Sequence, residues 1–109
     1  MDKKALGKRI NIARKSRRLT SERLSELCEV NATYIRQIEA GTKAPSLPVF
    51  VDICNALEVS PTYLLTDMLG KNEMSQFDKL SMLWSDAEPD QIRMVIAMLR
   101  AALEELRQD

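Results

Sequence analysis

Residues 19–41, LTSERLSELCEVNATYIRQIEAG, predict two short helices joined by a tight turn. The first helix covers residues 20–28, with Thr20 as its N-cap and with Leu24 and Leu27 on one side. The turn that follows is three residues long. Because so short a turn does not let the helices lie antiparallel, the segment has the form of two helices crossing at an angle.

The second helix of this segment covers residues 32–40. Asn31 caps its start and Gly41 ends it. Ile35 and Ile38, three residues apart, point inward and leave small and amide side chains on the opposite side. A short helix of this kind, held by its neighbours, suits the major groove of DNA, so we expect a DNA-binding protein.

The rest of the first 65 residues predicts three further helices and no strand. They are expected over about residues 3–17, after the cap Ser46 and after the cap Ser60. Their inward stripes are Leu6, Ile10 and Ala13, then Leu47, Phe50, Ile53, Cys54 and Leu57, and finally Tyr63, Leu64 and Leu65. The fold class is therefore all-α, with five helices in the first part of the chain.

The net charge of zero hides a division along the chain. Residues 1–65 hold eleven Lys or Arg and seven Asp or Glu, whereas residues 66–109 hold five and nine. A basic first part and an acidic second part fit a nucleic-acid module followed by a segment that avoids phosphate, although an ordinary solvated surface can look the same.

Composition excludes several other classes of protein. Cys28 and Cys54 fall at apolar helical positions and are expected to be reduced core residues. The chain has no His and no Cys-x-x-Cys, so we expect no zinc site. No nucleophile–base pair stands at motif spacing, so we expect neither an enzyme nor a cofactor. Neither a signal peptide nor an apolar run of about 20 residues is seen, and a cytoplasmic location without membrane contact is expected.

The last third of the chain is expected to make a homodimer. We divide the chain into a DNA-binding domain (residues 1–66), a linker (67–75) and a helical dimerisation segment (76–109). The apolar arc of the last helix is wider than one neighbour can cover. The expected dimer interface consists of Phe77, Leu80, Trp84, Ile92, Val95, Ile96, Leu99 and Leu103. The alternative is a monomer in which this segment folds back on the first five helices.

Residues 6–65 resemble the helix-turn-helix domain of the Cro/cI or XRE type found in phage and bacterial repressors. The resemblance is carried, in order and spacing, by LGKRINIARKSRRLT, RLSELCEVNATYIRQIEAG, KAPSLPVFVDICNAL and VSPTYLL. It implies a five-helix, lambda-repressor-like domain that acts as a dimer on a two-fold operator, with the helix from Ala32 as the recognition helix.

Three positions depart from the family pattern. Ser21 stands where the family often has a Gln that helps to contact DNA. Glu29 and Glu58 stand where Gly is common because a left-handed backbone is wanted, at a cost on the order of 1 kcal/mol each. These differences bear on affinity and sequence preference rather than on the fold.

The expected DNA contacts fall into two sets. Thr33 and Gln37, four residues apart, have side chains suited to thymine and adenine edges, and the resemblance adds Ala32. Arg36 is placed with these base readers, although a phosphate is its slightly preferred alternative. Phosphate contacts are expected from Ser21, Asn31, Thr42, Lys43, Arg9 and Arg17. For both sets the alternative is an ordinary solvent-facing role.

By resemblance, Arg14 and Glu39 form a mostly buried ion pair that joins the first helix to the recognition helix. A phosphate contact is the less favoured alternative for Arg14. Such a pair orients the two helices more than it stabilises them.

Three functions are compatible with these patterns. The leading one is a transcriptional regulator, a repressor that occupies a palindromic operator and excludes polymerase. The second is an antitoxin or anti-regulator whose C-terminal helices bind a partner protein. The third is an adaptor that keeps the fold but has lost DNA binding, which a steep salt dependence and preference for one palindrome would eliminate.

Overall fold

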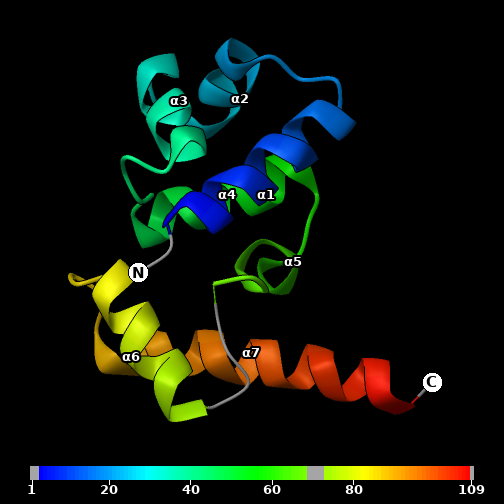
Figure 1. Cartoon of the computed structure of the whole chain (residues 1–109), viewed down its shortest axis with the longest axis vertical. Coiled ribbons are helices and arrows are strands. Elements are labelled where there is room, and N and C mark those ends of the chain that lie inside the picture. The colour runs from blue at the N-terminus through cyan, green and yellow to red at the C-terminus, as the bar shows by residue number, and fades with distance from the viewer. Residues whose placement is uncertain (1–2, 69–72, 109) are drawn as a thin grey trace. The chain divides into compact units, whose positions relative to one another are not determined.

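The computed structural model describes residues 3–68 and 73–108, and within the second range it places the side chains of residues 77–98, 100 and 101. Every regular element in these ranges is an α-helix, as the sequence predicts (Figure 1). The helices are α1 (Lys3–Ser16), α2 (Ser21–Cys28), α3 (Ala32–Ala40), α4 (Leu47–Leu57), α5 (Pro61–Leu65), α6 (Glu73–Leu83) and α7 (Pro89–Gln108). The chain divides into an N-terminal unit (residues 2–68) and a C-terminal unit (residues 69–109).

Local side-chain caps begin four helices of the N-terminal unit. The side chains of Thr20, Asn31, Ser46 and Ser60 each accept a hydrogen bond, 2.8–3.4 Å long, from the backbone N–H three residues further on. A cap of this kind satisfies one of the backbone donors that a helix start leaves without a partner. The starts of α2 to α5 are thus encoded locally, and all four predicted caps are confirmed.

Left-handed residues follow four helices of the same unit. Gly41 (φ 80°) ends α3, while Glu29 (φ 56°) and Glu58 (φ 55°) end α2 and α4. Arg18 (φ 58°) follows α1, and this conformation was not predicted. The backbone of a non-glycine residue costs about 1 kcal/mol in this conformation, so three helix ends of this unit carry strain that glycine would relieve.

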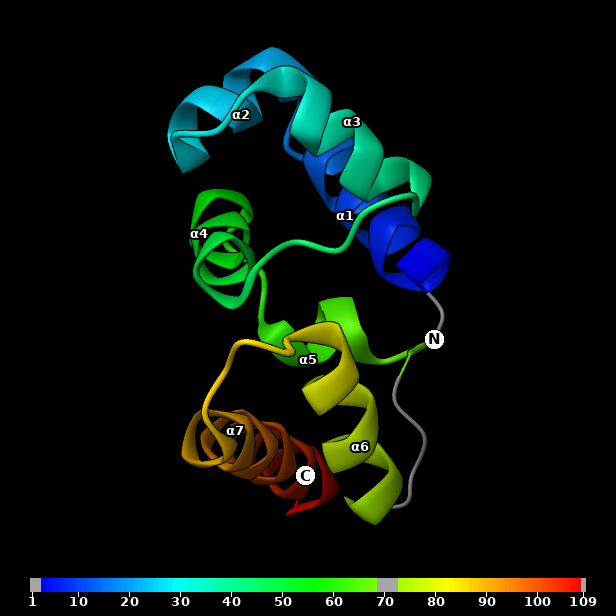
Figure 2. The same ribbon diagram turned by 90° about the vertical axis from the view of Figure 1, so that its left-hand side faces the viewer.

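The core of the N-terminal unit lies around α1. This helix packs against α3, α4 and α5, and α2 packs against α3 and α4 (Figures 1 and 2). The fully buried side chains come from all five helices and are Leu6, Ile10, Leu24, Ile35, Ile38, Phe50, Ile53, Leu57, Leu64 and Leu65. The predicted stripes of α1 and α3 are therefore confirmed, as is that of α4 except at its half-buried first residue, Leu47.

One predicted orientation in α2 is wrong. Leu24 is fully buried, but Leu27 is 43% exposed. Ser25 and Cys28 are buried instead. Successive helical residues turn by about 100°, so a face that contains Leu24, Ser25 and Cys28 is centred roughly 110° from Leu27 and turns it away. The sequence spacing of three was compatible with either orientation, and packing against α3 and α4 selects this one.

The C-terminal unit consists of α6 packed against α7. Helix α6 begins at Glu73, so the last residues of the predicted linker (67–75) are helical. Residues 69–72 of the linker lie outside the described residues. Helix α7 begins at Pro89, and proline is common at the first position of a helix. None of the helices in the described part of the chain has the length and apolar character that crossing a lipid bilayer requires.

Candidate nucleic-acid interface

Helix α3 presents one side to solvent and buries the other. Ile35 and Ile38 are inside the core. The four predicted base-reading residues occupy the remaining arc: Thr33 and Arg36 are exposed, and Ala32 and Gln37 are half-buried. Residues at these spacings share about 140° of a helix surface. The structure therefore places all four on one continuous strip.

The turn between α2 and α3 is held by backbone hydrogen bonds. The left-handed Glu29 lets its own N–H and that of Val30 return to carbonyls near the end of α2, the second at 3.0 Å from Ser25 O. Asn31 then starts α3, and its Oδ1 accepts from the N–H of Tyr34 at 2.8 Å. Asn31 thus organises the first turn of α3, and the start of a helix is a place where backbone N–H groups can bind a phosphate.

The other end of α3 fixes the loop that follows it. The backbone N–H and the hydroxyl of Thr42 donate to the carbonyl of Gln37 at 3.0 and 3.1 Å, and the N–H of Lys43 reaches the same carbonyl at 3.3 Å. Both residues are exposed. The backbone of Thr42 and Lys43, two expected phosphate contacts, is therefore fixed relative to Gln37. Ser21, the remaining candidate from α2, is half-buried.

Tyr34 connects α3 to the start of α4. Its hydroxyl donates to the carbonyl of Ala44 at 3.4 Å and accepts from the N–H of Ser46 at 3.2 Å. The residue is half-buried, so its ring packs against the domain while its hydroxyl holds the start of α4.

A buried ion pair joins α1 to the end of α3. Nε and Nη2 of Arg14 contact the two carboxylate oxygens of Glu39 at 2.8 and 3.0 Å, and the side chains are 11% and 8% exposed. Nη1 donates to the carbonyl of Leu19 at 2.7 Å. The hydrogen bond to Glu39 outweighs burial and raises the pKa of Arg14. All three guanidinium nitrogens are thus used inside the domain.

The structure adds a third member to this ion pair. Nδ2 of Asn11 donates to Oε1 of Glu39 at 2.5 Å. Sequence reasoning missed Asn11, although its position three residues before Arg14 places it on the same face of α1. The three side chains together orient α3 on α1.

Backbone contact at Gly7 brings α1 and α3 together. A Cβ atom at this position would lie 2.3 Å from the carbonyl oxygen of Ile38 and 2.7 Å from that of Glu39. Real Cβ atoms do not approach backbone oxygens so closely, so only glycine fits here. The close crossing at Gly7 and the ion pair of Arg14 are two turns apart along α1, and both act on the end of α3.

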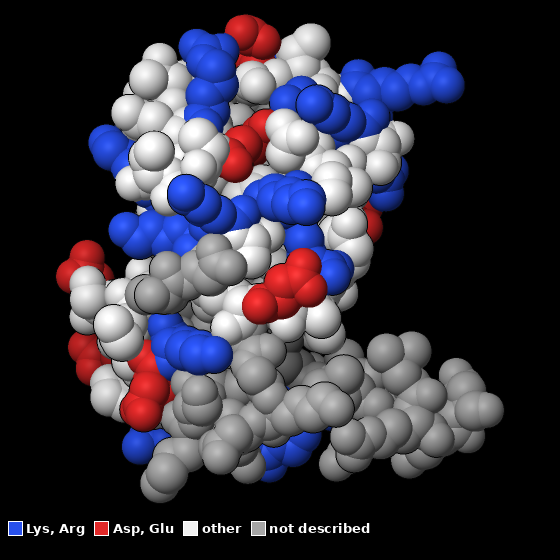
Figure 3. Space-filling model, viewed as in Figure 1, with Lys and Arg blue, Asp and Glu red and all other residues white. Residues whose placement is uncertain are grey.

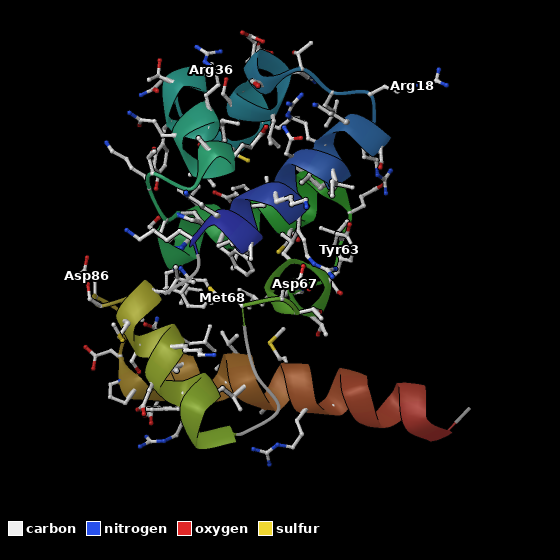
Figure 4. All side chains as sticks on the ribbon, in the orientation of Figure 1. Arg18, Arg36, Tyr63, Asp67, Met68 and Asp86 are labelled. Atoms are coloured by element: carbon white, nitrogen blue, oxygen red, sulfur yellow. The ribbon has the colours of Figure 1, made fainter. Side chains whose placement is uncertain are left out.

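Arg9 holds the end of the N-terminal unit rather than pointing into solvent. Its Nε and Nη2 contact both oxygens of Asp67 at 2.6 and 3.0 Å, and Nη1 donates to the carbonyl of Tyr63 at 3.0 Å. The guanidinium carbon lies 4.9 Å from the centre of the Tyr63 ring. The hydrogen bond between Arg9 and Asp67 raises the pKa of Arg9 and lowers that of Asp67. Figure 4 shows Tyr63 and Asp67 next to each other.

These contacts change two sequence interpretations. Tyr63 was expected in the core, but it is exposed and its ring supports Arg9. Arg9 was expected at a phosphate, but its three nitrogens are committed to Tyr63 and Asp67. The sequence separation of 54 and 58 residues gives no local signal for such contacts.

Three exposed ion pairs involve other arginines of the unit. Arg17 pairs with Glu58, Arg23 with Glu26 on α2, and Arg36 with Glu22 across α2 and α3. Figure 4 shows Arg36 at the α2–α3 end of the unit and Arg18 extending away from it. In the view of Figure 3, Lys and Arg side chains are spread over the N-terminal unit rather than gathered in one stripe. Exposed pairs contribute little to stability, so these arginines remain available to a ligand.

The predicted dimer residues lie mostly inside the single chain. Leu80, Trp84, Ile92 and Ile96 are buried, and Phe77 and Val95 are half-buried. Leu99 and Leu103 lie outside the residues whose side chains are described. The large apolar side chains that remain exposed in the C-terminal unit are Met82, Met94 and Met98, at 67%, 64% and 54% among the described residues.

Both cysteines are free and buried, which confirms the sequence interpretation of core thiols. Burial raises the pKa of Cys28 to about 11 and that of Cys54 to about 12. The reactive thiolate is therefore scarce at neutral pH, and neither residue has the properties of a reactive cysteine.

Comparison with known proteins agrees with this geometry. Two solved structures of the clp gene regulator ClgR from Corynebacterium glutamicum are similar to this chain. One is 24% identical, covers 66% of this chain and 97% of its own, and has a TM-score of 0.58. The other is 21% identical, covers 99% of this chain and 88% of its own, and has a TM-score of 0.53. At these identities the likeness shows a common fold. A search of curated proteins found no match.

The N-terminal unit also matches a protein family by sequence. Residues 7–68 match the family described as a helix-turn-helix domain, and this match covers more than half of the chain. Its boundaries agree closely with those of the N-terminal unit. The protein therefore belongs to the family of XRE-type helix-turn-helix domains.

Proposed function

We propose that this protein is a sequence-specific, double-stranded DNA-binding transcriptional regulator that represses by occupying a palindromic operator as a homodimer. The observation that carries the proposal is the solvent-facing strip of α3 formed by residues 32, 33, 36 and 37. The strip projects from a helix whose opposite side is buried and whose two ends are held by caps. A rigid, exposed recognition helix is what reading base edges in a major groove requires.

Each set of contacts has a distinct part in this proposal. Thr33 and Gln37 face the base edges, with Ala32 small enough to let the start of α3 approach them. Ser21 begins α2, Asn31 precedes α3, and Thr42 and Lys43 follow α3, and at these helix ends we propose that the DNA backbone passes. We propose Arg17 as a weaker phosphate contact, because its exposed ion pair with Glu58 has to open before a phosphate binds. Arg9 is left out because its guanidinium is engaged within the domain.

The C-terminal unit supplies the second half of the proposal. A single recognition helix reads few base pairs, so a repressor of this size needs two copies about 34 Å apart on DNA. Met94 and Met98 are four residues apart on α7 and both exposed, with the exposed Ala97 between them. In Figure 1, the C-terminal half of α7 extends beyond α6. The pairing surface we propose is this exposed side of α7 rather than its buried stripe.

Two substitutions test the division between base and phosphate contacts. Gln37→Ala should reduce discrimination at one base pair by about 1–3 kcal/mol. Lys43→Ala should weaken binding to all sequences evenly and reduce the salt slope by about 1. Fluorescence anisotropy with a selected duplex and its single base-pair variants, at several salt concentrations, measures both quantities. Gln37→Ala with an unchanged base preference would contradict the proposed reading of DNA by α3.

A further inference from the structure

Arg36 of the recognition helix is held from outside that helix. Its Nη1 donates to Oε1 of Glu22 on α2 at 3.0 Å, and both side chains are more than half exposed. The pKa of Glu22 is lowered, first by a hydrogen bond from its own backbone and next by Arg36, so the carboxylate is charged at neutral pH. A negative charge thus lies beside one of the predicted base readers, at the α2 side of the strip.

The contact between Glu22 and Arg36 differs from those of the structural arginines. Arg9 and Arg14 each donate from Nε, Nη1 and Nη2 to groups of the domain. The bond of Arg36 uses one nitrogen and one carboxylate oxygen, and Nε and Nη2 carry further N–H groups. Glu22 therefore restricts where the guanidinium lies and leaves it the donors needed for a second partner.

The charge of Glu22 makes one kind of partner unfavourable. A phosphate bound to Arg36 would be brought close to the carboxylate, and like charges repel. The ion pair also neutralises part of the charge that would attract the phosphate. The major-groove edge of guanine is uncharged and offers two acceptors, O6 and N7, which match two N–H groups of arginine. A base edge meets the donors of Arg36 without this repulsion.

The geometry points to Glu22 as a positioning residue that directs Arg36 to a guanine and away from the DNA backbone. This inference rests on the proposed function and deepens it, because it assigns one base of each half-site and the residue that enforces it. It also resolves the two roles that the sequence left open for Arg36. Glu22 itself contacts the arginine and not the DNA.

The experiment uses the full chain and a duplex that the wild-type protein selects from random DNA, together with all single base-pair variants of that duplex. Arg36→Met should abolish the preference for guanine at one position in each half-site. Glu22→Gln keeps the size of the side chain and removes its charge. It should reduce the preference at that same position by at least about fivefold, and increase the salt slope by about 1, as Arg36 turns to a phosphate.

Glu26→Gln is the matched control. Glu26 lies on the same helix, pairs with Arg23 at the same distance of 3.0 Å, and loses the same charge on substitution. It should leave the guanine preference unchanged. Because both pairs are exposed, each variant should lose less than about 1 kcal/mol of stability and stay folded at the temperature of the binding assay, which separates positioning from stability.

Three results would overturn the inference. Glu22→Gln with an unchanged guanine preference would show that Arg36 needs no guidance. Arg36→Met that only lowers the salt slope would show a phosphate contact. A wild-type protein that selects no sequence at all would reject the proposed function together with this inference, whereas the first two results reject the inference alone.

Discussion

The N-terminal and C-terminal units expose their apolar side chains in different ways. The large apolar residues that the N-terminal unit exposes are Ile12, Leu27, Val51 and Tyr63, and each comes from a different helix. The C-terminal unit exposes methionines to a greater extent, and Met94 and Met98 share one side of α7. Single exposed apolar residues are ordinary, but a continuous apolar face indicates a binding partner. The difference supports the proposal that the second unit, rather than the first, pairs with another chain.

The largest expected effect concerns the stability of the N-terminal unit. Arg14→Met should reduce the free energy of unfolding by about 3–5 kcal/mol, because it leaves the carboxylate of Glu39 buried without its partner. Urea unfolding followed by circular dichroism measures this loss. Arg17→Met removes an exposed pair and should cost less than about 1 kcal/mol. Equal effects of the two substitutions would contradict a special structural role for Arg14.

A smaller loss is expected at the crossing of α1 and α3. Gly7→Ala gains about 1 kcal/mol in helix propensity. It should nevertheless lose about 1–3 kcal/mol overall, because the new Cβ would meet the backbone oxygens of Ile38 and Glu39. Lys8→Ala, at an exposed position of the same helix, should change stability by less than about 0.5 kcal/mol. A Gly7→Ala variant as stable as the wild type would show that the crossing is loose.

Self-association through the C-terminal unit is tested by substituting its exposed methionines. The double substitution Met94→Glu and Met98→Glu should weaken self-association at least tenfold, about 1.4 kcal/mol, since charges would replace the apolar face. Light scattering over a range of concentrations measures it, and a chain ending at Met68 should be monomeric. Val51→Glu, at an exposed position of the N-terminal unit, is the control. A monomeric wild type would contradict the proposed homodimer.

The smallest effect is expected at a strained helix end. Glu29→Gly should stabilise the protein by about 0.5–1 kcal/mol, because glycine adopts the left-handed conformation of this residue without strain. Glu26→Gly, within α2, should destabilise it by about 1 kcal/mol. Thermal unfolding of the two variants should therefore shift in opposite directions. A lower melting temperature for Glu29→Gly would contradict the strain assigned to this turn.

Much of the N-terminal unit follows from local signals in the sequence. Thr20, Asn31, Ser46 and Ser60 each satisfy a backbone N–H within their own first turn, so the helix starts do not depend on tertiary packing. The exposed strip of α3 follows from helical periodicity once Ile35 is buried. The ion pair of Arg14 and Glu39 came from family resemblance, since nothing local joins residues 25 positions apart.

What the sequence did not predict depends on tertiary contacts. The roles of Arg9 and Tyr63 arise from a contact with Asp67, far along the chain. Arg18 carries no sequence signal for a left-handed backbone. The sequence likewise does not show which residues of the wide apolar arc of α7 are covered by the same chain. For this reason the buried Ile92 and Ile96 were assigned to the interface with a second copy. Glu22 was missed because its partner lies on a different helix.

The most direct test of the central claim is selection of bound sites from random double-stranded DNA by the full chain. The selected sequences should be enriched in one inverted repeat, with half-sites about one helical turn apart, and a variant carrying Thr33→Ala and Gln37→Ala should lose that enrichment. No enrichment, or enrichment that survives the double substitution, would contradict a protein that reads DNA through the exposed strip of α3.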